Sequence, residues 1–295
     1  MDFRFLFIGI CLFYCNVCCV AQCHIDDWIA LKALYENTDG DNWVEKDGWE
    51  LIKGDVPPGN CDLGMLKGVT LDEDYNTRVE RLSLSNNNLV GQLPDEIGKL
   101  IKIKNFSMPF NQVSGNIPAS IGQLEILERI NLDFNNLNGE IPIEFLNLNR
   151  LSTIQLQYNF LSGEIPTEIV YMQNIFKIYL NNNQLTGRIP EYNNPNKSIF
   201  LFLHNNQLTG SIPSVFGNVR FNAQKLTLFN NNLSGCFDEN LSNMCDSFRD
   251  GVYGFQDSIS EGNDFDATWS EFCFEGKGIC DTTKLMPLVG SFNCD

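Results

Sequence analysis

The chain has 295 residues, of which 20 are Lys or Arg and 37 are Asp or Glu, so its formal net charge is −17. This acidic balance excludes a nucleic-acid partner and an anionic membrane surface, because both need a basic face. Hydrophobic residues make up 43% of the chain and include 22 Phe, which is enough to form a core and excludes wholesale disorder. With only two His available, zinc-type clusters are disfavoured, and we expect no metal and no cofactor.

Residues 1–22 have the pattern of a secretory signal peptide. An apolar run of eleven residues follows Arg4, and small residues precede a cleavage site after Ala21 or Gln22. A membrane anchor and a bacterial lipoprotein attached at Cys23 are the alternatives, but the run is short for a span and Gln22 is bulky for a lipidation site. We therefore expect a secreted, extracellular protein without a membrane anchor, either free or associated with a wall or matrix.

Seven cysteines remain outside this segment, and an oxidising compartment would pair them. They lie only towards the two ends of the chain: Cys23, Cys61, Cys236, Cys245, Cys273, Cys280 and Cys294. We expect the disulfides Cys23–Cys61, Cys236–Cys245 and Cys273–Cys280, although spacing alone does not prove connectivity. The odd cysteine, Cys294, is then either a free thiol or an intermolecular cross-link that would give a disulfide-linked oligomer.

Two acidic clusters near the start of the chain are candidates for calcium binding. They are Asp39-Gly40-Asp41 and Asp72-Glu73-Asp74. Neither has the spacing of the twelve-residue calcium loop. We therefore interpret both clusters as solvated polar surface.

The middle of the chain is an internal repeat of about 24 residues. In each period an Asn is followed by an apolar residue and then a Gly, and these residues are Asn87, Asn111, Asn135, Asn159, Asn183, Asn206 and Asn231. Apolar residues alternate before each Asn, as at Leu82 and Leu84, which predicts one short half-buried strand per repeat. A single strand of this kind cannot bury its own apolar face, so we expect the turns to stack into a parallel sheet. The Asn amides should form a ladder that satisfies buried backbone groups.

The pattern L-x-L-x-x-N-x-L-x-G-x-I-P resembles the leucine-rich repeat family, in its 24-residue plant-type subclass, over about Val79 to Met244. The resemblance implies an α/β repeat solenoid with a curved parallel sheet on its concave face, which binds a partner rather than catalysing a reaction. Residues 30–49 and 236–280 resemble caps of such repeats, and this layout is similar to diplomonad cyst wall proteins. The expected units are a signal peptide at 1–22, an N-terminal cap at 23–78, seven repeats at 79–245 and an acidic cysteine-containing cap at 246–295.

Strand residues that point away from the core form the predicted binding face. Seven of them are aromatic: Phe110, Phe134, Tyr158, Tyr179, Phe200, Phe202 and Phe229. A contiguous exposed aromatic patch indicates a surface for a protein or for sugar rings, and the alternative is the chance scatter of a Phe-rich sequence. Polar residues nearby are candidates to orient a ligand: Arg129, Asp133, Gln155, Gln157, Lys177, Asn181 and His204. His204 is also a candidate pH sensor.

Four N-glycosylation sequons, at Asn105, Asn196, Asn232 and Asn240, are typical of a secreted eukaryotic glycoprotein. A glycan at Asn105 would direct a partner towards the later repeats. In the fifth repeat, the polar segment 191–197 replaces the helix-like outer part of the repeat, and we expect it to be a surface loop.

The sequence shows no nucleophile motif, no phosphate-binding loop and no metal spacing, so we expect no enzyme. Three functions stay open. The first is recognition of an extracellular protein or polysaccharide through the concave face. The second is a structural role in an extracellular or cyst wall or matrix, cross-linked by disulfides. The third is inhibition of a secreted hydrolase.

Overall fold

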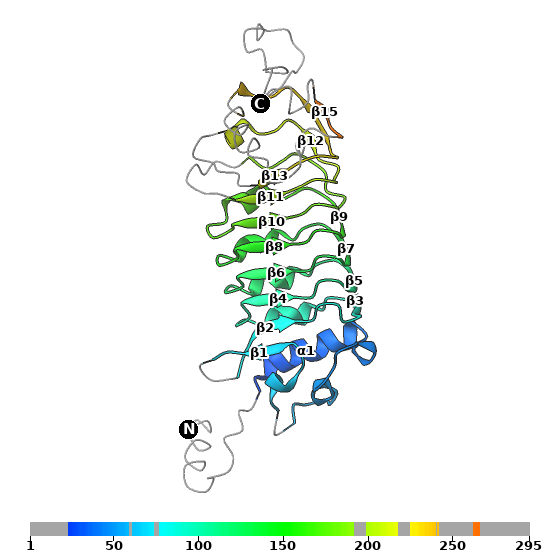
Figure 1. Ribbon diagram of the computed structural model, residues 1–295. Coiled ribbons are helices and arrows are strands. Elements are labelled where there is room, and N and C mark those ends of the chain that lie inside the picture. Colours follow the sequence, from blue (N-terminus) through cyan, green and yellow to red (C-terminus); the bar gives the residue numbers. More distant parts are fainter. Residues whose placement is uncertain are drawn as a thin grey trace.

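The computed structural model describes residues 23–58, 61–73, 77–191, 199–217, 225–239, 241 and 262–265. The predicted signal peptide, the polar segment of the fifth repeat and most of the C-terminal cap lie outside this set. So do Cys245, Cys273, Cys280, Cys294 and the sequons at Asn196 and Asn240. The described part of the chain is a stack of similar turns, which begins at helix α1 and ends at strand β15 (Figure 1).

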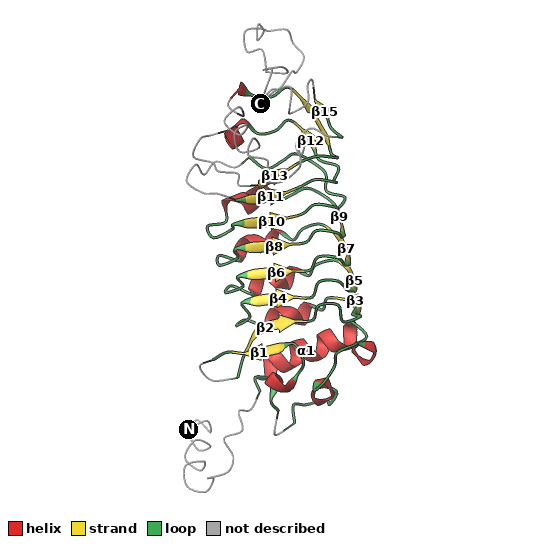
Figure 2. Cartoon of the chain, viewed as in Figure 1, coloured by secondary structure: helices red, strands yellow, loops and turns green. Residues whose placement is uncertain are grey.

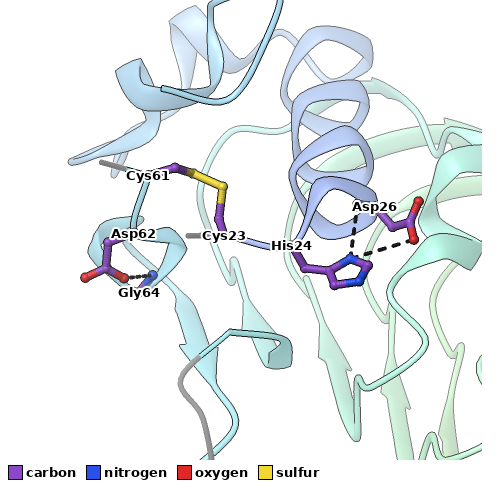
Figure 3. The surroundings of a disulfide bond; sticks show 6 residues. All are labelled: Cys23, His24, Asp26, Cys61, Asp62 and Gly64. Carbon is purple, nitrogen blue, oxygen red and sulfur yellow. Dashed lines mark hydrogen bonds and ion pairs between the residues drawn. A yellow bond between two sulfur atoms is a disulfide. The ribbon is translucent and has the colours of Figure 1, made fainter. Parts of the chain in front are cut away.

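The N-terminal cap contains the one α-helix among the described residues, α1 at Ile25–Asn37. Its start is fixed by His24, whose Nδ1 accepts from the backbone N–H of Asp26 at 3.3 Å. Three short 3₁₀ helices follow, at Gly40–Asn42, Trp49–Ile52 and Leu63–Met65. A disulfide joins Cys23 to Cys61, as predicted, and Figure 3 shows it beside the beginning of α1.

The main sheet has eight strands in the order β1-β2-β4-β6-β8-β10-β11-β13. All neighbours are parallel except β1, which pairs antiparallel with β2 and covers the first edge of the sheet. The strands are β1 Val69–Leu71, β2 Val79–Ser83, β4 Asn105–Ser107, β6 Arg129–Asn131, β8 Thr153–Gln155, β10 Lys177–Tyr179, β11 Phe200–Phe202 and β13 Lys225–Thr227. One apolar residue of each repeat strand is buried in the core, which confirms the stacked parallel sheet.

A second row of strands follows the Asn of each repeat and forms what we call the lateral face (Figure 2). These strands are β3 Val90–Gln92, β5 Gln112–Gly115, β7 Asn136–Gly139, β9 Phe160–Leu161, β12 Thr209–Gly210, β14 Asn232–Gly235 and β15 Asp264–Phe265. Repeats one to four and repeat six then close through a 3₁₀ helix: Asp95–Lys99, Ala119–Gln123, Ile143–Asn147, Thr167–Tyr171 and Ser214–Gly217. The core therefore lies between the main sheet, the lateral face and these helices.

The Asn of each repeat connects one turn to the next. The side-chain N–H of Asn135 donates to the carbonyl of Met108 at 3.0 Å in the preceding turn, and its Oδ1 accepts from the backbone N–H of Val113 at 3.0 Å. The same pattern continues to Asn231 and then to Asn263, whose Oδ1 accepts from Leu233 N–H. The ladder thus extends one turn beyond the seven repeats read from the sequence. The sequence reading missed this turn because the spacing before Asn263 is longer than one period.

Gly91 shows why the first turn fits closely against the cap. Its φ is +138°, and a Cβ at this position would lie 1.9 Å from the carbonyl oxygen of Asn37 at the end of α1. A side chain would therefore clash with backbone and adopt an unfavourable conformation. The glycine allows the N-terminal cap to pack directly on the lateral face of the first repeat.

Candidate binding surface

The residue directly before each ladder Asn has a left-handed backbone conformation. This holds for eight successive turns, at Asn86, Phe110, Phe134, Tyr158, Asn182, Asn205, Asn230 and Gly262, with φ between 50° and 68°. Gly and Asn are the residues that adopt this conformation most readily. Three aromatic residues therefore occupy positions at which the other turns carry Asn or Gly.

We call Phe110, Phe134 and Tyr158 the aromatic ladder. The ring centroids of Phe110 and Phe134 lie 4.5 Å apart, and those of Phe134 and Tyr158 lie 4.1 Å apart, with interplanar angles of 14° and 12°. The three side chains are 52%, 37% and 44% exposed. The sequence correctly placed them in one column, and the structure adds that they stack face to face, so that the central ring, Phe134, has a neighbouring ring on both faces.

The same column continues as a chain of amides. Asn230 donates from Nδ2 to Oδ1 of Asn205 at 2.7 Å, and Asn205 donates in the same way to Asn182 at 2.7 Å. The buried Nδ2 of Asn182 has no hydrogen-bond partner, and the preceding residue of the column is Tyr158, an aromatic ring. The amide chain was not predicted, although three Asn at one repeat position were visible in the sequence.

Next to the aromatic ladder, Asp133 differs from its expected solvent-facing position. It is only 6% exposed, and desolvation raises its pKa from 3.8 to about 6. Its Oδ2 accepts from Nε2 of Gln157 at 2.7 Å, but its buried Oδ1 has no partner. The Oε1 atom of Gln157 is likewise buried without a partner. Asn181, one turn further on, is also buried.

The remaining predicted aromatic residues form a second group in repeats five to seven. Tyr179 stacks on Phe202 at 4.6 Å, and the His204 ring stacks on Phe229 at 4.4 Å. Nδ1 of His204 also lies 2.7 Å from Oγ1 of Thr227. These side chains are half-buried, so they offer less apolar surface than the aromatic ladder.

The predicted cationic residues lie at the other end of the strands. Nζ of Lys177 is 5.5 Å from the ring centres of both Phe176 and Phe200, which is cation–π geometry. Arg129 is exposed, and its Nη1 donates to Oδ1 of Asn105 at 3.4 Å. Asn105, the Asn of the first predicted sequon, is half-buried on the same face. The predicted polar residue Gln155 is half-buried on β8. Phe176, which is 41% exposed, was not among the residues predicted from the sequence.

The acidic clusters take part in protein contacts. Oδ1 of Asp41 accepts from the hydroxyl of Tyr35 at 2.8 Å and forms an ion pair with Lys53. This pairing with Lys53 lowers the pKa of Asp41. Asp72 accepts from the backbone N–H groups of Thr77 and Arg78, both at 2.9 Å. Across the described segments, no three acidic, His or Cys side chains are grouped to hold a metal ion.

Three segments of the chain match the Leucine Rich Repeat family model, at residues 78–100, 127–148 and 199–219. No curated protein sequence matches the chain. Among solved structures, the chain is similar to a plant ice-binding protein, with 25% identity and a TM-score of 0.63 over 83% of this chain and 73% of that one. It is also similar to PEPR1 in the PEPR1–AtPEP1 structure, with 28% identity and a TM-score of 0.63 over 74% of this chain and 30% of that one.

These comparisons and the stacked turns define the class: the chain has the leucine-rich repeat fold. It spans about a third of the PEPR1 chain that it matches. Within the described residues, no helix is long and apolar enough to cross a membrane. One disulfide between described residues, Cys23–Cys61, fixes the N-terminal cap, and Cys236 is also disulfide-bonded.

Proposed function

We propose that the chain is a secreted leucine-rich repeat protein that binds an extended segment of a protein partner on the outward surface of the main sheet. The observation that carries the proposal is the aromatic ladder. It places three exposed, ordered rings side by side on successive turns. Aromatic side chains in a contiguous exposed patch are typical anchors of protein interfaces.

The geometry of the ladder favours a protein over a polysaccharide. A sugar ring binds to the open face of an aromatic ring, but both faces of Phe134 are covered, by Phe110 on one side and Tyr158 on the other. The exposed ring edges form an apolar ridge, against which aliphatic side chains can pack. PEPR1–AtPEP1, a structure of similar fold, is itself a complex, which supports the same choice.

Secretion is supported by the disulfide chemistry and by the N-terminal sequence. Cys23 and Cys61 are bonded, as is Cys236, and disulfides persist in oxidising compartments. The apolar segment after Arg4 provides the export signal that this location requires.

The test of this function is selection from a random peptide library displayed on phage, with the secreted, disulfide-bonded protein immobilised. We expect enriched peptides that bind with micromolar affinity in calorimetry. The double variant Phe134→Asn/Tyr158→Asn should weaken their binding about tenfold or more, because it removes the apolar ridge. Asn is the residue that other turns carry at this position, for example Asn182, so the variant should fold.

Phe160→Gln is the matched control. Phe160 is 51% exposed in the same repeat as Tyr158, but it lies on the lateral face, where neighbouring turns carry Gln or Asn. This variant should bind the selected peptides as the wild type does. Equal binding by all three proteins, or no enrichment at all, would refute a peptide-binding role for the ladder.

The matrix alternative rests on the odd cysteine count and has a separate test. A disulfide-linked wall component would stay in the insoluble fraction of whole cells until a thiol is added. A recognition protein or a hydrolase inhibitor would be recovered as a soluble monomer without thiol, and loss of a target hydrolase's activity on mixing would identify the inhibitor.

The likeness to an ice-binding protein does not carry over to a particular surface of this chain. The lateral face is the most regular one, yet its row of exposed Asn and Gln side chains is interrupted by Phe160. Charged side chains of Glu140, Glu164 and Arg188 are also exposed along it. We therefore expect no inhibition of ice recrystallisation by the purified protein.

A further inference from the structure

Two hydrogen-bond acceptors without donors lie together beside the aromatic ladder. Oδ1 of Asp133 and Oε1 of Gln157 are both shielded from solvent, and neither has a partner. The two side chains are joined by the 2.7 Å hydrogen bond from Nε2 of Gln157 to Oδ2 of Asp133. They come from successive turns at the same repeat position, so the pair lies just beyond the ends of the neighbouring strands β6 and β8.

Such a pair is costly in the free protein. A carboxylate that is only 6% exposed needs hydrogen bonds or a countercharge, and an unpaired buried acceptor loses its hydration without compensation. Desolvation alone raises the pKa of Asp133, with no contribution from a neighbouring charge. None of the ion pairs formed among the described residues includes Asp133. The described part of the chain therefore does not supply the donor that this pair lacks.

We propose that the bound partner supplies it: Asp133 and Gln157 form a subsite for a cationic group of the partner peptide, an arginine or lysine side chain. This inference rests on the proposed peptide-binding function and specifies the chemistry that the surface selects. Gln157 is half-buried and hydrogen-bonded to Oδ2 of Asp133, so binding requires its side chain to rotate away from the carboxylate. The cation then donates to Oδ1 of Asp133 and to Oε1 of Gln157.

Arginine fits the position best. A guanidinium group has several N–H donors in one plane, which matches a carboxylate next to an amide oxygen. Its methylene stem would pack along the exposed ring edges of Phe134 and Tyr158, in the way long basic side chains cover apolar surface. A divalent metal ion is a poorer occupant, because the pair itself offers one carboxylate and the described residues contain no group of three acidic, His or Cys side chains that could hold a metal ion. The net charge of −17 also favours approach of a basic partner.

The subsite also makes binding dependent on pH. The pKa of Asp133 is about 6, so the carboxyl group is charged at pH 7.5 and largely protonated at pH 5. Gln157 and the side chain of Asn131, which accepts from the Asp133 backbone N–H at 3.0 Å, are neutral in this range. Binding of a cation should consequently weaken as the pH falls from 7.5 to 5.

The experiment compares a peptide selected from the phage library with a copy in which its arginine is replaced by citrulline, a neutral side chain of the same shape. Both are titrated into wild type and into Asp133→Asn at pH 7.5 and pH 5. Asn181 occupies the same position one repeat beyond Gln157 and is equally buried, so Asp133→Asn should fold. Asp133→Ser is a second variant for the same purpose, because the first repeat carries Ser85 at this position.

With the wild type at pH 7.5 we expect the citrulline peptide to bind about tenfold more weakly, and this difference should vanish at pH 5 and in Asp133→Asn. Selected peptides without a basic residue, or an arginine preference that persists in both Asp133 variants, would overturn the subsite. In either case binding that depends on Phe134 and Tyr158 leaves the proposed function standing. Failure to select any peptide refutes the proposed function first and the subsite with it.

Discussion

At the scale of single residues, the aromatic ladder balances two opposing terms. The left-handed conformation costs a non-glycine residue roughly 1–2 kcal/mol, and less for Asn. Each stacked aromatic pair returns about 0.5–1.5 kcal/mol beyond its buried area. Phe134 takes part in both stacks of the ladder, at 4.5 and 4.1 Å, so stacking offsets its backbone strain. The ladder can therefore be kept for binding at little cost in stability.

Phe134→Asn should test that balance. The substitution removes two stacking contacts and the buried part of a Phe side chain that is 37% exposed, and it relieves one strained backbone position, so the free energy of unfolding should fall by roughly 1–2 kcal/mol. Urea denaturation followed by circular dichroism measures it. A loss of several kcal/mol would show that the ladder is part of the core rather than a surface for a partner.

Asp133 should make stability fall as the pH rises. Its pKa is about 6 in the folded chain against 3.8 for an ordinary Asp, so the folded state keeps a proton that the unfolded state releases between these values. From pH 4 to pH 7, the wild type should lose roughly 2.4 kcal/mol relative to Asp133→Asn. Urea denaturation of both proteins across this range measures the difference. A constant difference would mean that the carboxyl group is not buried as described.

At the scale of the repeat, the Asn ladder holds each turn to the next. The side chain of Asn135 makes hydrogen bonds to the backbone of two turns and is 6% exposed. Its removal leaves several buried backbone groups without partners, and each of these carries its own desolvation penalty. The ladder is therefore the polar complement of the apolar core.

Asn135→Ala should lower the free energy of unfolding by roughly 2–4 kcal/mol. Asn136→Ala is the control, since Asn136 is the next residue, exposed on the lateral face, and should change stability by less than about 0.5 kcal/mol. Thermal denaturation of the two variants separates a structural ladder from the general effect of removing an amide. Equal losses in both would contradict the assignment.

At the scale of the whole molecule, each turn contacts only its neighbours, so the ends decide how the stack opens. The N-terminal cap is held together by a disulfide and packs on the first turn through hydrogen bonds of Asp27 and a close backbone contact. The disulfide fixes residue 23 to residue 61, Asp27 accepts from Arg78 Nη2 at 2.8 Å and from Val79 N–H at 2.6 Å, and Gly91 packs on the end of α1. Loss of the cap would expose the apolar edge of the first repeat.

Cys23→Ser/Cys61→Ser should therefore destabilise the protein from its N-terminal end. The disulfide closes a loop of 38 residues, for which the chain-entropy relation gives roughly 4 kcal/mol. Hydrogen exchange should rise first in strand β2 and only later in strand β8, because stability in a repeat stack is transmitted from neighbour to neighbour. Uniform acceleration in every repeat would instead indicate that the stack unfolds as one unit.

Much of this architecture could be predicted from the sequence, because in a repeat protein the residues that make equivalent contacts recur at a fixed spacing. The alternation around Leu82 and Leu84 predicted the main sheet, and the recurring Asn predicted the ladder. Asn263 was missed because it lies more than one period after Asn231. The available signal was Phe265, which stands two residues after Asn263, at the position where every other repeat carries an apolar residue. The lateral face was also missed, as it consists of strands of two to four residues whose pairing depends on the stack.

The sequence by itself determined the repeat fold and the column that holds Phe110, Phe134 and Tyr158, because both follow from spacing along the chain. It predicted the Cys23–Cys61 disulfide, but the pairing itself was fixed only by the structure. Only the tertiary structure decided that the rings cover one another's faces, and that Asp133 is buried with an unpaired oxygen. Those properties depend on the distance between adjacent turns and on the side chain that each neighbouring turn contributes. Such contacts join residues 24 positions apart, and no local pattern encodes how closely they approach.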